Sequence, residues 1–364
     1  MTLLTETPTV TFTASEFAPR PAEARGVARD EVRLLVGTPD GLDHVRFRDL
    51  PDHLRAGDVL VVNDSATVPG EVDATLGGAA VVLHVAARLD EDERVVEVRS
   101  APDAARAVLD AGPGDVVQAG DAHLTLLAPW PTGAASSPTG RGNRLWRARV
   151  AGPLDDLLAR RGRPIAYGYL DGRYPLAAYQ TVFGRRPGSA EMASAGRPFT
   201  EALVTRLVRS GVLFAPVTLH TGVSSQEAGE APGPEWFEVS PTAALLVEAA
   251  RAGGGRVIAV GTTATRAIES AVVDGAVTAS RGWTSRVVTP GDPPRVVDGL
   301  VTGWHDPHAS HLLLVEAVAG RALTQAAYDA AVARGYLWHE FGDAALLLGR
   351  RQHSRPLARP VGSR

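Results

Sequence analysis

Hydrophobic residues fall along this chain in short unbroken runs, and the clearest run, VIAV at residues 257–260, stands directly before a helical pattern. Such a run is typical of a strand buried on both faces of a sheet. Gly261 permits a sharp turn after it, and Thr262 or Thr263 can cap the helix that TTATRAIES predicts. Because free N–H groups at a helix start attract carboxylates and phosphates, this unit predicts an anion site.

Arg266 lies in or near the first turn of that helix, where the helix dipole disfavours a cation. Two interpretations follow. An anionic ligand compensates the charge, or Arg266 is solvated or pairs with Glu269. The local motif alone favours the second interpretation, because strand-turn-helix units are common in proteins that bind nothing there.

Further hydrophobic runs predict more strands of the same sheet. VLVV at residues 59–62 predicts a buried strand that ends at Asn63 and Asp64, and VLFAPVTLHT predicts another that ends at His220. Side chains at the carboxyl ends of strands commonly meet a ligand in α/β sheets. These three residues are therefore candidates for a site.

Capping residues mark the predicted helices. Thr200 stands before one amphipathic stretch, and Ser240 stands before another that has Pro241 at its first position. Two stretches rich in Ala and Leu, 308–318 and 324–334, predict further helices near the end of the chain.

Between residues 71 and 150 the pattern changes to short β-type runs separated by Gly, Pro, Asp and Asn, spaced like the strands of a small barrel or sandwich. We interpret this region as an inserted β domain, since 364 residues exceed the ~100–200 of one domain. The predicted division is a flexible N-terminal arm over 1–25, an α/β catalytic core over 26–70 and 151–349, the insertion over 71–150, and an Arg-rich tail over 350–364.

Composition narrows the chemistry. The chain has no Cys, and none of its basic side chains is Lys, which excludes disulfides, thiolate sites, lysine Schiff bases and Walker-type phosphate loops. A net charge of −4 argues against a protein that coats nucleic acid, although the five Arg of the tail could contact RNA. A solvated end is the commoner role of such a charge run. The first residues lack the pattern of a signal peptide, so we expect a cytoplasmic enzyme.

Two histidines and one aromatic pair are the remaining candidates. His220 and His305 each follow a predicted strand, and a neutral imidazole can accept or return a proton near pH 7. Isolated histidines are more often structural. His305, His308 and His311 are close in sequence, but no carboxylate pattern accompanies them, so we expect no metal. Trp236 and Phe237 could lie against a cationic or planar ligand, or pack under the following helix.

Eight segments, in this order, resemble the S-adenosylmethionine:tRNA ribosyltransferase-isomerase family of queuosine biosynthesis. The resemblance extends from about Arg29 to Leu348, and it rests on the order of the segments rather than on any one of them. They are GDVLVVNDSATVPGEV, YQTVFG, GSAEMASAGRPFT, VTLHTG, EWFEVS, GRVIAVGTTATRAIES, VDGLVTGWHDPHASHLLLVEAVAG and YLWHEFGDAALLL.

The resemblance implies a mixed α/β core of barrel-like character with an inserted β-barrel domain. It also implies an enzyme that transfers the ribosyl group of S-adenosylmethionine to 7-aminomethyl-7-deazaguanine in tRNA and isomerises it to epoxyqueuosine, releasing adenine and methionine. His220 and His305 match histidines of the family and become its catalytic candidates. The polar positions that match, with Trp236 in the EWFEVS segment, become substrate-binding candidates: Asn63, Asp64, Gly261, Thr262, Thr263, Arg266 and Glu269.

The chain also departs from the family pattern. Ala66 stands where the family usually has Arg, Arg197-Pro198 where it has Leu-His, and Asp306-Pro307-His308 where it has Leu-Pro-Lys. Lost basic side chains weaken contacts to RNA phosphate. Two alternatives therefore stay open: an S-adenosylmethionine-dependent enzyme acting on a small molecule, and a non-catalytic relative that only binds a ligand.

Overall fold

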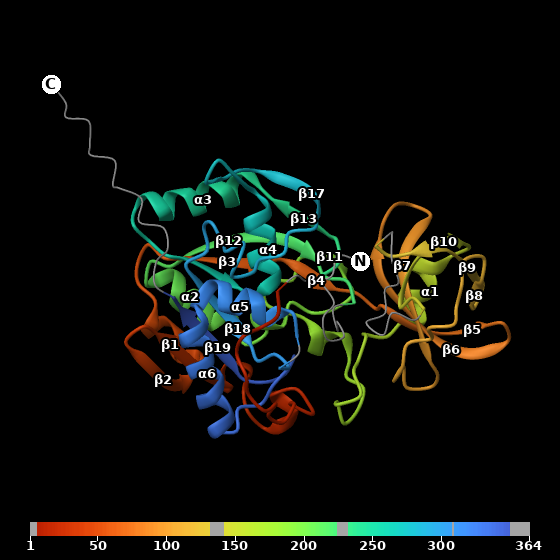
Figure 1. Cartoon of the computed structure of the whole chain (residues 1–364), viewed down its shortest axis with the longest axis horizontal. Coiled ribbons are helices and arrows are strands. Elements are labelled where there is room, and N and C mark those ends of the chain that lie inside the picture. Colours follow the sequence, from red (N-terminus) through yellow and green to blue (C-terminus); the bar gives the residue numbers. More distant parts are fainter. Residues whose placement is uncertain (1–5, 132–141, 224–231, 308, 350–364) are drawn as a thin grey trace.

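The computed structural model describes residues 6–131, 142–223, 232–307 and 309–349. It consists of a mixed α/β core and a smaller β-barrel at one end of the long axis (Figure 1). The mixed α/β class and the inserted β-barrel predicted from the sequence are confirmed, whereas the sheet of the core is open rather than barrel-like. The Arg-rich tail and His308 lie outside the described residues.

One mixed sheet of nine strands forms the centre of the core. Its four middle strands, β12, β3, β14 and β18, are parallel to one another, so their carboxyl ends meet at one edge of the sheet. The sheet is open, with β17 and β2 as its edges. In spatial order its strands are β17 (Ser280–Thr284), β13 (Glu235–Val239), β12 (Leu213–His220), β3 (Val59–Asn63), β14 (Val257–Val260), β18 (Gly299–Gly303), β19 (Ala344–Leu348), β1 (Arg33–Thr38) and β2 (Gly41–Arg46).

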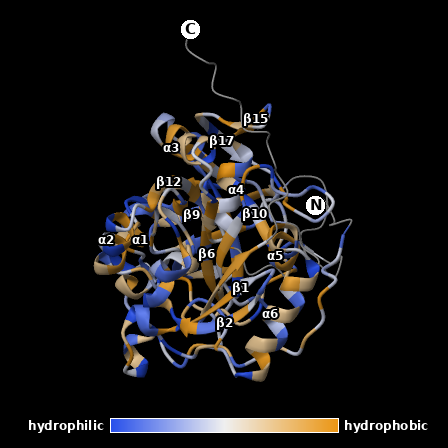
Figure 2. Ribbon diagram, turned by 90° about the vertical axis from the view of Figure 1, so that its left-hand side faces the viewer, coloured by the Kyte–Doolittle hydropathy of each residue, from blue (hydrophilic) through white to orange (hydrophobic). Residues whose placement is uncertain are grey.

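Helices cover both faces of this sheet, as the unbroken hydrophobic runs predict. Val59 and Val61 of β3 pack into one core, and Leu60 and Val62 pack into the other. The first core is covered by α3 (Pro241–Ala252), α4 (Thr262–Ser270), α5 (His311–Ala319) and α6 (Arg321–Ala333), and the second by α2 (Glu201–Arg209) and the 3₁₀ helix Phe47–His53. Figure 2 shows orange strands in the interior and most blue residues along the periphery.

The predicted caps are right for two helices and wrong for a third. The hydroxyl of Thr200 accepts a hydrogen bond from Leu203 N at 3.2 Å, and that of Ser240 accepts one from Ala243 N at 3.1 Å. Neither Thr262 nor Thr263 caps α4, because Gly261 itself holds the N-cap position, with φ +92° and no side chain.

The inserted strands close into a six-stranded barrel. Its interior is filled by alternating apolar side chains and by α1 (Leu154–Arg161), which packs Leu154, Leu157 and Leu158 against them. Whether this barrel folds as a domain by itself stays a prediction. The strands, in spatial order, are β10 (Leu145–Ala151), β7 (Glu93–Ser100), β6 (Ala79–Arg88), β5 (Glu71–Leu76), β8 (Val116–Ala119) and β9 (Ala122–Pro129).

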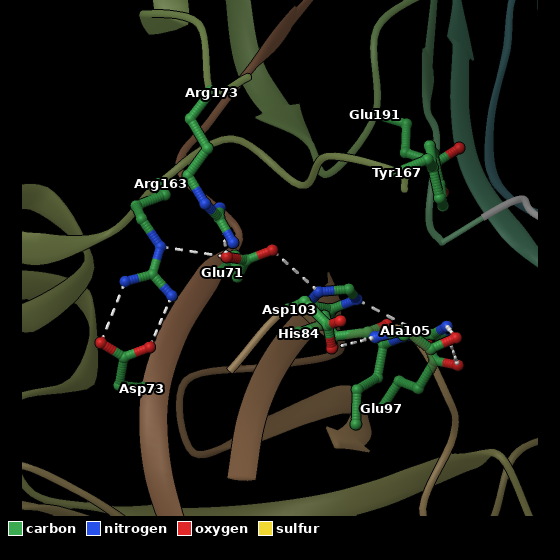
Figure 3. A network of polar contacts seen from close by, with 12 residues as sticks. Glu71, Asp73, His84, Glu97, Asp103, Ala105, Arg163, Tyr167, Arg173 and Glu191 are labelled. Atoms are coloured by element: carbon green, nitrogen blue, oxygen red, sulfur yellow. Dashed lines mark hydrogen bonds and ion pairs between the residues drawn. The ribbon is translucent and has the colours of Figure 1, made fainter. Parts of the chain in front are cut away.

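Ion pairs hold the barrel to the segment that returns to the core (Figure 3). Oε1 of the buried Glu71 carboxylate forms ion pairs with Arg163 Nε at 3.0 Å and with Arg173 Nη1 at 2.5 Å. Its Oε2 lies 3.2 Å from His84 Nε2. Burial by itself lowers the pKa of His84, but the carboxylates of Glu71 and Glu97 outweigh it and raise the pKa. The junction therefore has a dense set of charges that compensate one another.

The N-terminal segment, predicted as a flexible arm, packs against the core where it is described. Thr9 donates from both its N–H and its hydroxyl to the carboxylate of Glu316, each at 2.7 Å, and the ring of Phe12 stacks on Tyr328 at 4.4 Å. Ala18 is fully buried. These are contacts of single residues, which leave no periodic pattern in the sequence, so the sequence did not indicate them; the flexibility of the arm stays a prediction.

Asp58 ties together the amino ends of the two central strands β3 and β14. Its side chain is fully buried and accepts hydrogen bonds from Arg55 N, Arg256 N and the Arg256 guanidinium at 2.5–3.2 Å. Breaking a buried ion pair from one side leaves the other charge without its partner. Asp58 is therefore central to the stability of the sheet.

Replacing Asp58 with Ala is expected to lower the free energy of unfolding by about 3–5 kcal/mol, because the Arg256 guanidinium loses a buried partner. Urea unfolding followed by circular dichroism measures this loss. Asp52→Ala is the matched control, since it removes an exposed partner of Arg206 and is expected to cost at most ~1 kcal/mol. Equal losses in the two variants would contradict the role given to Asp58.

Candidate active site

A cavity of about 270 Å³ lies at the carboxyl ends of β14 and β18. Gly261, Thr262 and Thr263, at the start of α4, line it together with Thr302 and Gly303 from the end of β18. This is the edge of a parallel sheet at which ligands bind in α/β proteins. The volume is slightly below the ~300–1,000 Å³ that is usual for small-molecule sites.

The start of α4 is suited to an anion. The first N–H groups of a helix have no partner within the helix, and no side chain caps those of α4. Gly261 takes φ +92°, a conformation that glycine adopts without strain, and a Cβ there would lie 3.3 Å from Ala195 Cβ. The residues that carry these N–H groups line the cavity, so the anion site predicted from the sequence has a physical basis.

Arg266 lines the same cavity, but its guanidinium is already engaged. It forms an ion pair with Glu235, and it donates from Nε to Arg286 O and from Nη2 to Gly233 O, each at 3.0 Å. Burial raises the pKa of Glu235, although the charge of Arg266 opposes this rise. The expected pairing with Glu269 is wrong. Arg266 and Glu235 form one mutually compensated pair in the wall of the cavity.

Glu269, a substrate-binding candidate from the sequence, holds backbone N–H groups in the structure. Its buried carboxylate accepts the N–H groups of Arg295, Val296 and Val297 at 2.7, 2.9 and 3.0 Å. It is not among the residues that line the cavity. Glu269 therefore fixes the segment before β18 onto α4.

His305 lines the cavity as a neutral imidazole. Its Nε2 lies 3.0 Å from Thr302 Oγ1, and its ring stacks on that of His311 at 5.0 Å. Burial lowers the pKa of His305 well below its usual value, and the nearby His311 lowers it further. Burial and the charge of Arg266 lower the pKa of His311 to about 4. Both rings are thus uncharged near pH 7, and His305 can accept a proton there.

His220 is outside the lining of the cavity, although its neighbour Thr221 belongs to it. His220 Nδ1 lies 2.7 Å from Ser65 Oγ, which lies 2.6 Å from Ser189 Oγ. The ring stacks on Trp236 at 5.3 Å, and a Cβ at Gly188 would lie 2.6 Å from it. Burial lowers the pKa of His220. The structure therefore gives His220 a hydrogen-bonded and stacked position behind the cavity wall.

Asn63 and Asp64 join the strands behind the cavity. The Asn63 amide donates to Leu219 O at 2.9 Å and to Thr263 Oγ1 at 3.2 Å, which ties β3 to β12 and to the start of α4. Asp64 accepts a hydrogen bond from Thr218 Oγ1 at 2.5 Å. Like Trp236, neither residue lines the cavity. The residues proposed from the sequence that do line the cavity are Gly261, Thr262, Thr263, Arg266 and His305.

Among the polar residues of the cavity that sequence reasoning missed are Tyr167, Glu191, His339 and Glu340. Glu191 lies within GSAEMASAG and Glu340 within YLWHEFGD, two of the segments that carry the family resemblance. Burial and the charge of Glu191 raise the pKa of Glu340 to about 8. Because both residues lie in loops, no strand or helix period indicated which side chains face inward.

Within the part of the chain that the structure describes, no group of three or more His, Asp or Glu side chains is arranged to hold a metal ion. The helices described there are also too short or too polar to cross a membrane.

A cavity at a parallel-sheet edge, with an uncapped helix start and a neutral imidazole, is typical of α/β enzymes and suits an anionic group and proton transfer. Comparison with known proteins identifies the family. The profile of the family described as queuosine biosynthesis protein matches residues 11–347. An S-adenosylmethionine:tRNA ribosyltransferase-isomerase of Symbiobacterium thermophilum is 37% identical over 88% of this chain and 94% of that protein. The chain belongs to the queuosine biosynthesis protein family.

Further relatives have the same description. A ribosyltransferase-isomerase of Anaeromyxobacter dehalogenans is 37% identical over 90% of this chain and 96% of its own length. A crystal structure of an S-adenosylmethionine tRNA ribosyltransferase from Thermotoga maritima covers 94% of this chain and 99% of that chain, at 25% identity and a TM-score of 0.49.

Replacing Glu269 with Gln is expected to lower the free energy of unfolding by about 1–3 kcal/mol, because the amide cannot accept all three buried N–H groups. The affinity of the folded variant for S-adenosylmethionine should stay unchanged. Thermal unfolding and calorimetry measure the two quantities. Glu201→Gln, on the exposed first turn of α2, is the control and should change stability by less than about 0.5 kcal/mol. Weaker ligand binding at unchanged stability would show instead that Glu269 contributes to ligand binding.

Proposed function

We propose that this chain transfers the ribosyl group of S-adenosylmethionine to 7-aminomethyl-7-deazaguanine in tRNA and isomerises it, giving epoxyqueuosine and releasing adenine and methionine. The observation that carries the proposal is the 37% identity, over 88% of this chain, to the S-adenosylmethionine:tRNA ribosyltransferase-isomerase of Symbiobacterium thermophilum. The family profile, which matches residues 11–347, supports it as well.

The chemistry of this reaction agrees with the polar groups of the cavity. The sulfonium of S-adenosylmethionine acidifies the adjacent 5′ carbon, so the reaction needs a base that is uncharged before it acts. His305 meets this requirement, because burial keeps its imidazole neutral. Departure of adenine and closure of the epoxide need further proton transfer and charge stabilisation. The N–H groups at the start of α4 are suited to hold an anionic group of the substrate.

We assign the direct proton transfer to His305 and keep His220 as the second catalytic candidate. His305 borders the cavity, whereas His220 is linked to it through Thr221 and through the Ser65–Ser189 hydroxyl pair. Since tRNA and S-adenosylmethionine are both found in the cytoplasm, a cytoplasmic location belongs to the same proposal.

Three incubations of the purified protein test the proposed function: with S-adenosylmethionine alone, with added tRNA that carries the aminomethyl deazaguanine, and with the free base. Release of adenine and methionine is expected only with the tRNA. Release without tRNA would favour an enzyme acting on a small molecule. Binding without any turnover would favour a non-catalytic relative. Either of these results would overturn the proposal.

Two matched histidine variants test the assignment of the base. His305→Asn is expected to lower the rate of adenine release by about 10²–10⁴-fold, the usual contribution of a general base, while S-adenosylmethionine still binds. His220→Asn removes an imidazole of the same kind outside the cavity, and we expect a smaller loss. Single-turnover kinetics, calorimetry and melting temperatures separate chemistry, binding and folding. The assignment fails if His220→Asn loses more activity than His305→Asn at equal stability.

A further inference from the structure

Two carboxyl groups that the proposed proton transfers do not use line the cavity together, those of Glu191 and Glu340. Glu191 follows β11 (Arg186–Ser189), and Glu340 lies in the loop before β19. The hydroxyl of Tyr167 donates to Glu191, and that of Tyr169 donates to Glu340 Oε2 at 3.3 Å. Figure 3 shows Tyr167 and Glu191 side by side, away from the barrel network.

The charge of this pair is set by burial and by the closeness of its members. Burial raises the pKa of Glu340 to about 8, and the negative charge of Glu191 contributes to the rise. Near pH 7 Glu340 is therefore protonated, and the pair carries about one negative charge. The charge of Arg197 opposes the rise, but its guanidinium is itself bound to Glu23 and to Ala178 O, each at 2.9 Å.

We propose that Glu191 and Glu340 form the subsite for the primary amine of the acceptor base, bound as its ammonium ion. This inference rests on the proposed function and names the residues that select its acceptor. An ammonium group donates up to three hydrogen bonds, and the carboxyl oxygens of the two side chains accept them. One positive charge on the ligand matches about one negative charge on the pair.

The cationic groups of S-adenosylmethionine fit this wall less well. Its ammonium shares a carbon with a carboxylate, which the negative charge of Glu191 would repel. Its sulfonium has no N–H to donate. The aminomethyl group of the acceptor, in contrast, carries its charge alone. Glu191 and Glu340 therefore face the acceptor, and the start of α4 is left for an anionic group of S-adenosylmethionine.

The first experiment measures KM for the acceptor tRNA and for S-adenosylmethionine in Glu191→Gln, with Glu201→Gln as a surface control. At pH 7 the Glu191 variant is expected to raise the acceptor KM about 10- to 100-fold, as for the loss of a charged hydrogen bond, with an unchanged KM for S-adenosylmethionine. A rise in the KM for S-adenosylmethionine instead, or no change in either, overturns the inference.

The second experiment uses pH. Because a bound ammonium favours the ionised form of Glu340, acceptor affinity of the unmodified protein should rise with pH up to about 8 and then level off, until the amine itself deprotonates. Glu340→Gln should abolish this rise. A variant that keeps the slope of the unmodified protein overturns the inference. A purely structural role for Glu340 would not produce this difference.

A third experiment separates failure of this inference from failure of the proposed function. Calorimetry compares binding of 7-aminomethyl-7-deazaguanine with that of 7-methyl-7-deazaguanine, which lacks the amine. The unmodified protein should prefer the aminomethyl base, and Glu191→Gln should lose the preference. If that holds without turnover on tRNA, only the proposed function fails. If turnover occurs while the unmodified protein shows no preference, only the inference fails.

Discussion

Parallel pairing of β3 with β12 on one side and β14 on the other is the constraint on which the rest of the core depends. The register pairs Val59 with Leu213 and with Val257, so the three strands start together. Because they run in the same direction, their carboxyl ends deliver His220, Asn63 and Gly261 to one edge of the sheet. The Asn63 amide then fixes that edge, since it bonds to β12 and to the first turn of α4.

Burial determines the charge of nearly every titratable group at that edge. A charged side chain in a low-dielectric cavity needs a partner or changes its protonation. Arg266 forms an ion pair with Glu235, while His305 and His311 stay neutral. Glu340 holds its proton to about pH 8. The site thus contains an uncharged proton acceptor, an uncapped helix start and a carboxyl pair, which together suit a substrate of mixed charge.

Local patterns predicted the strands and most helix starts, because hydrophobic runs and caps act over a few residues. The strand at 257–260, the Thr200 and Ser240 caps and the closed barrel are examples. Side-chain partners could not be predicted in this way. Arg266 pairs with a residue 31 positions away rather than three, and Glu269 accepts N–H groups from a loop 26 to 28 positions away. Such contacts depend on how the chain returns after the sheet has formed.

The packed N-terminal segment explains one departure from the family pattern. Arg197, which stands where the family usually has Leu, is buried and binds the carboxylate of Glu23. Its guanidinium also lies over the ring of Phe341, at 4.8 Å from the centroid, and Arg25 donates to Phe341 O at 2.7 Å. The N-terminal segment thereby fixes the residue that directly follows Glu340. Arg197 therefore adds a charge inside the protein, next to the residue that follows Glu340, rather than a contact for RNA phosphate.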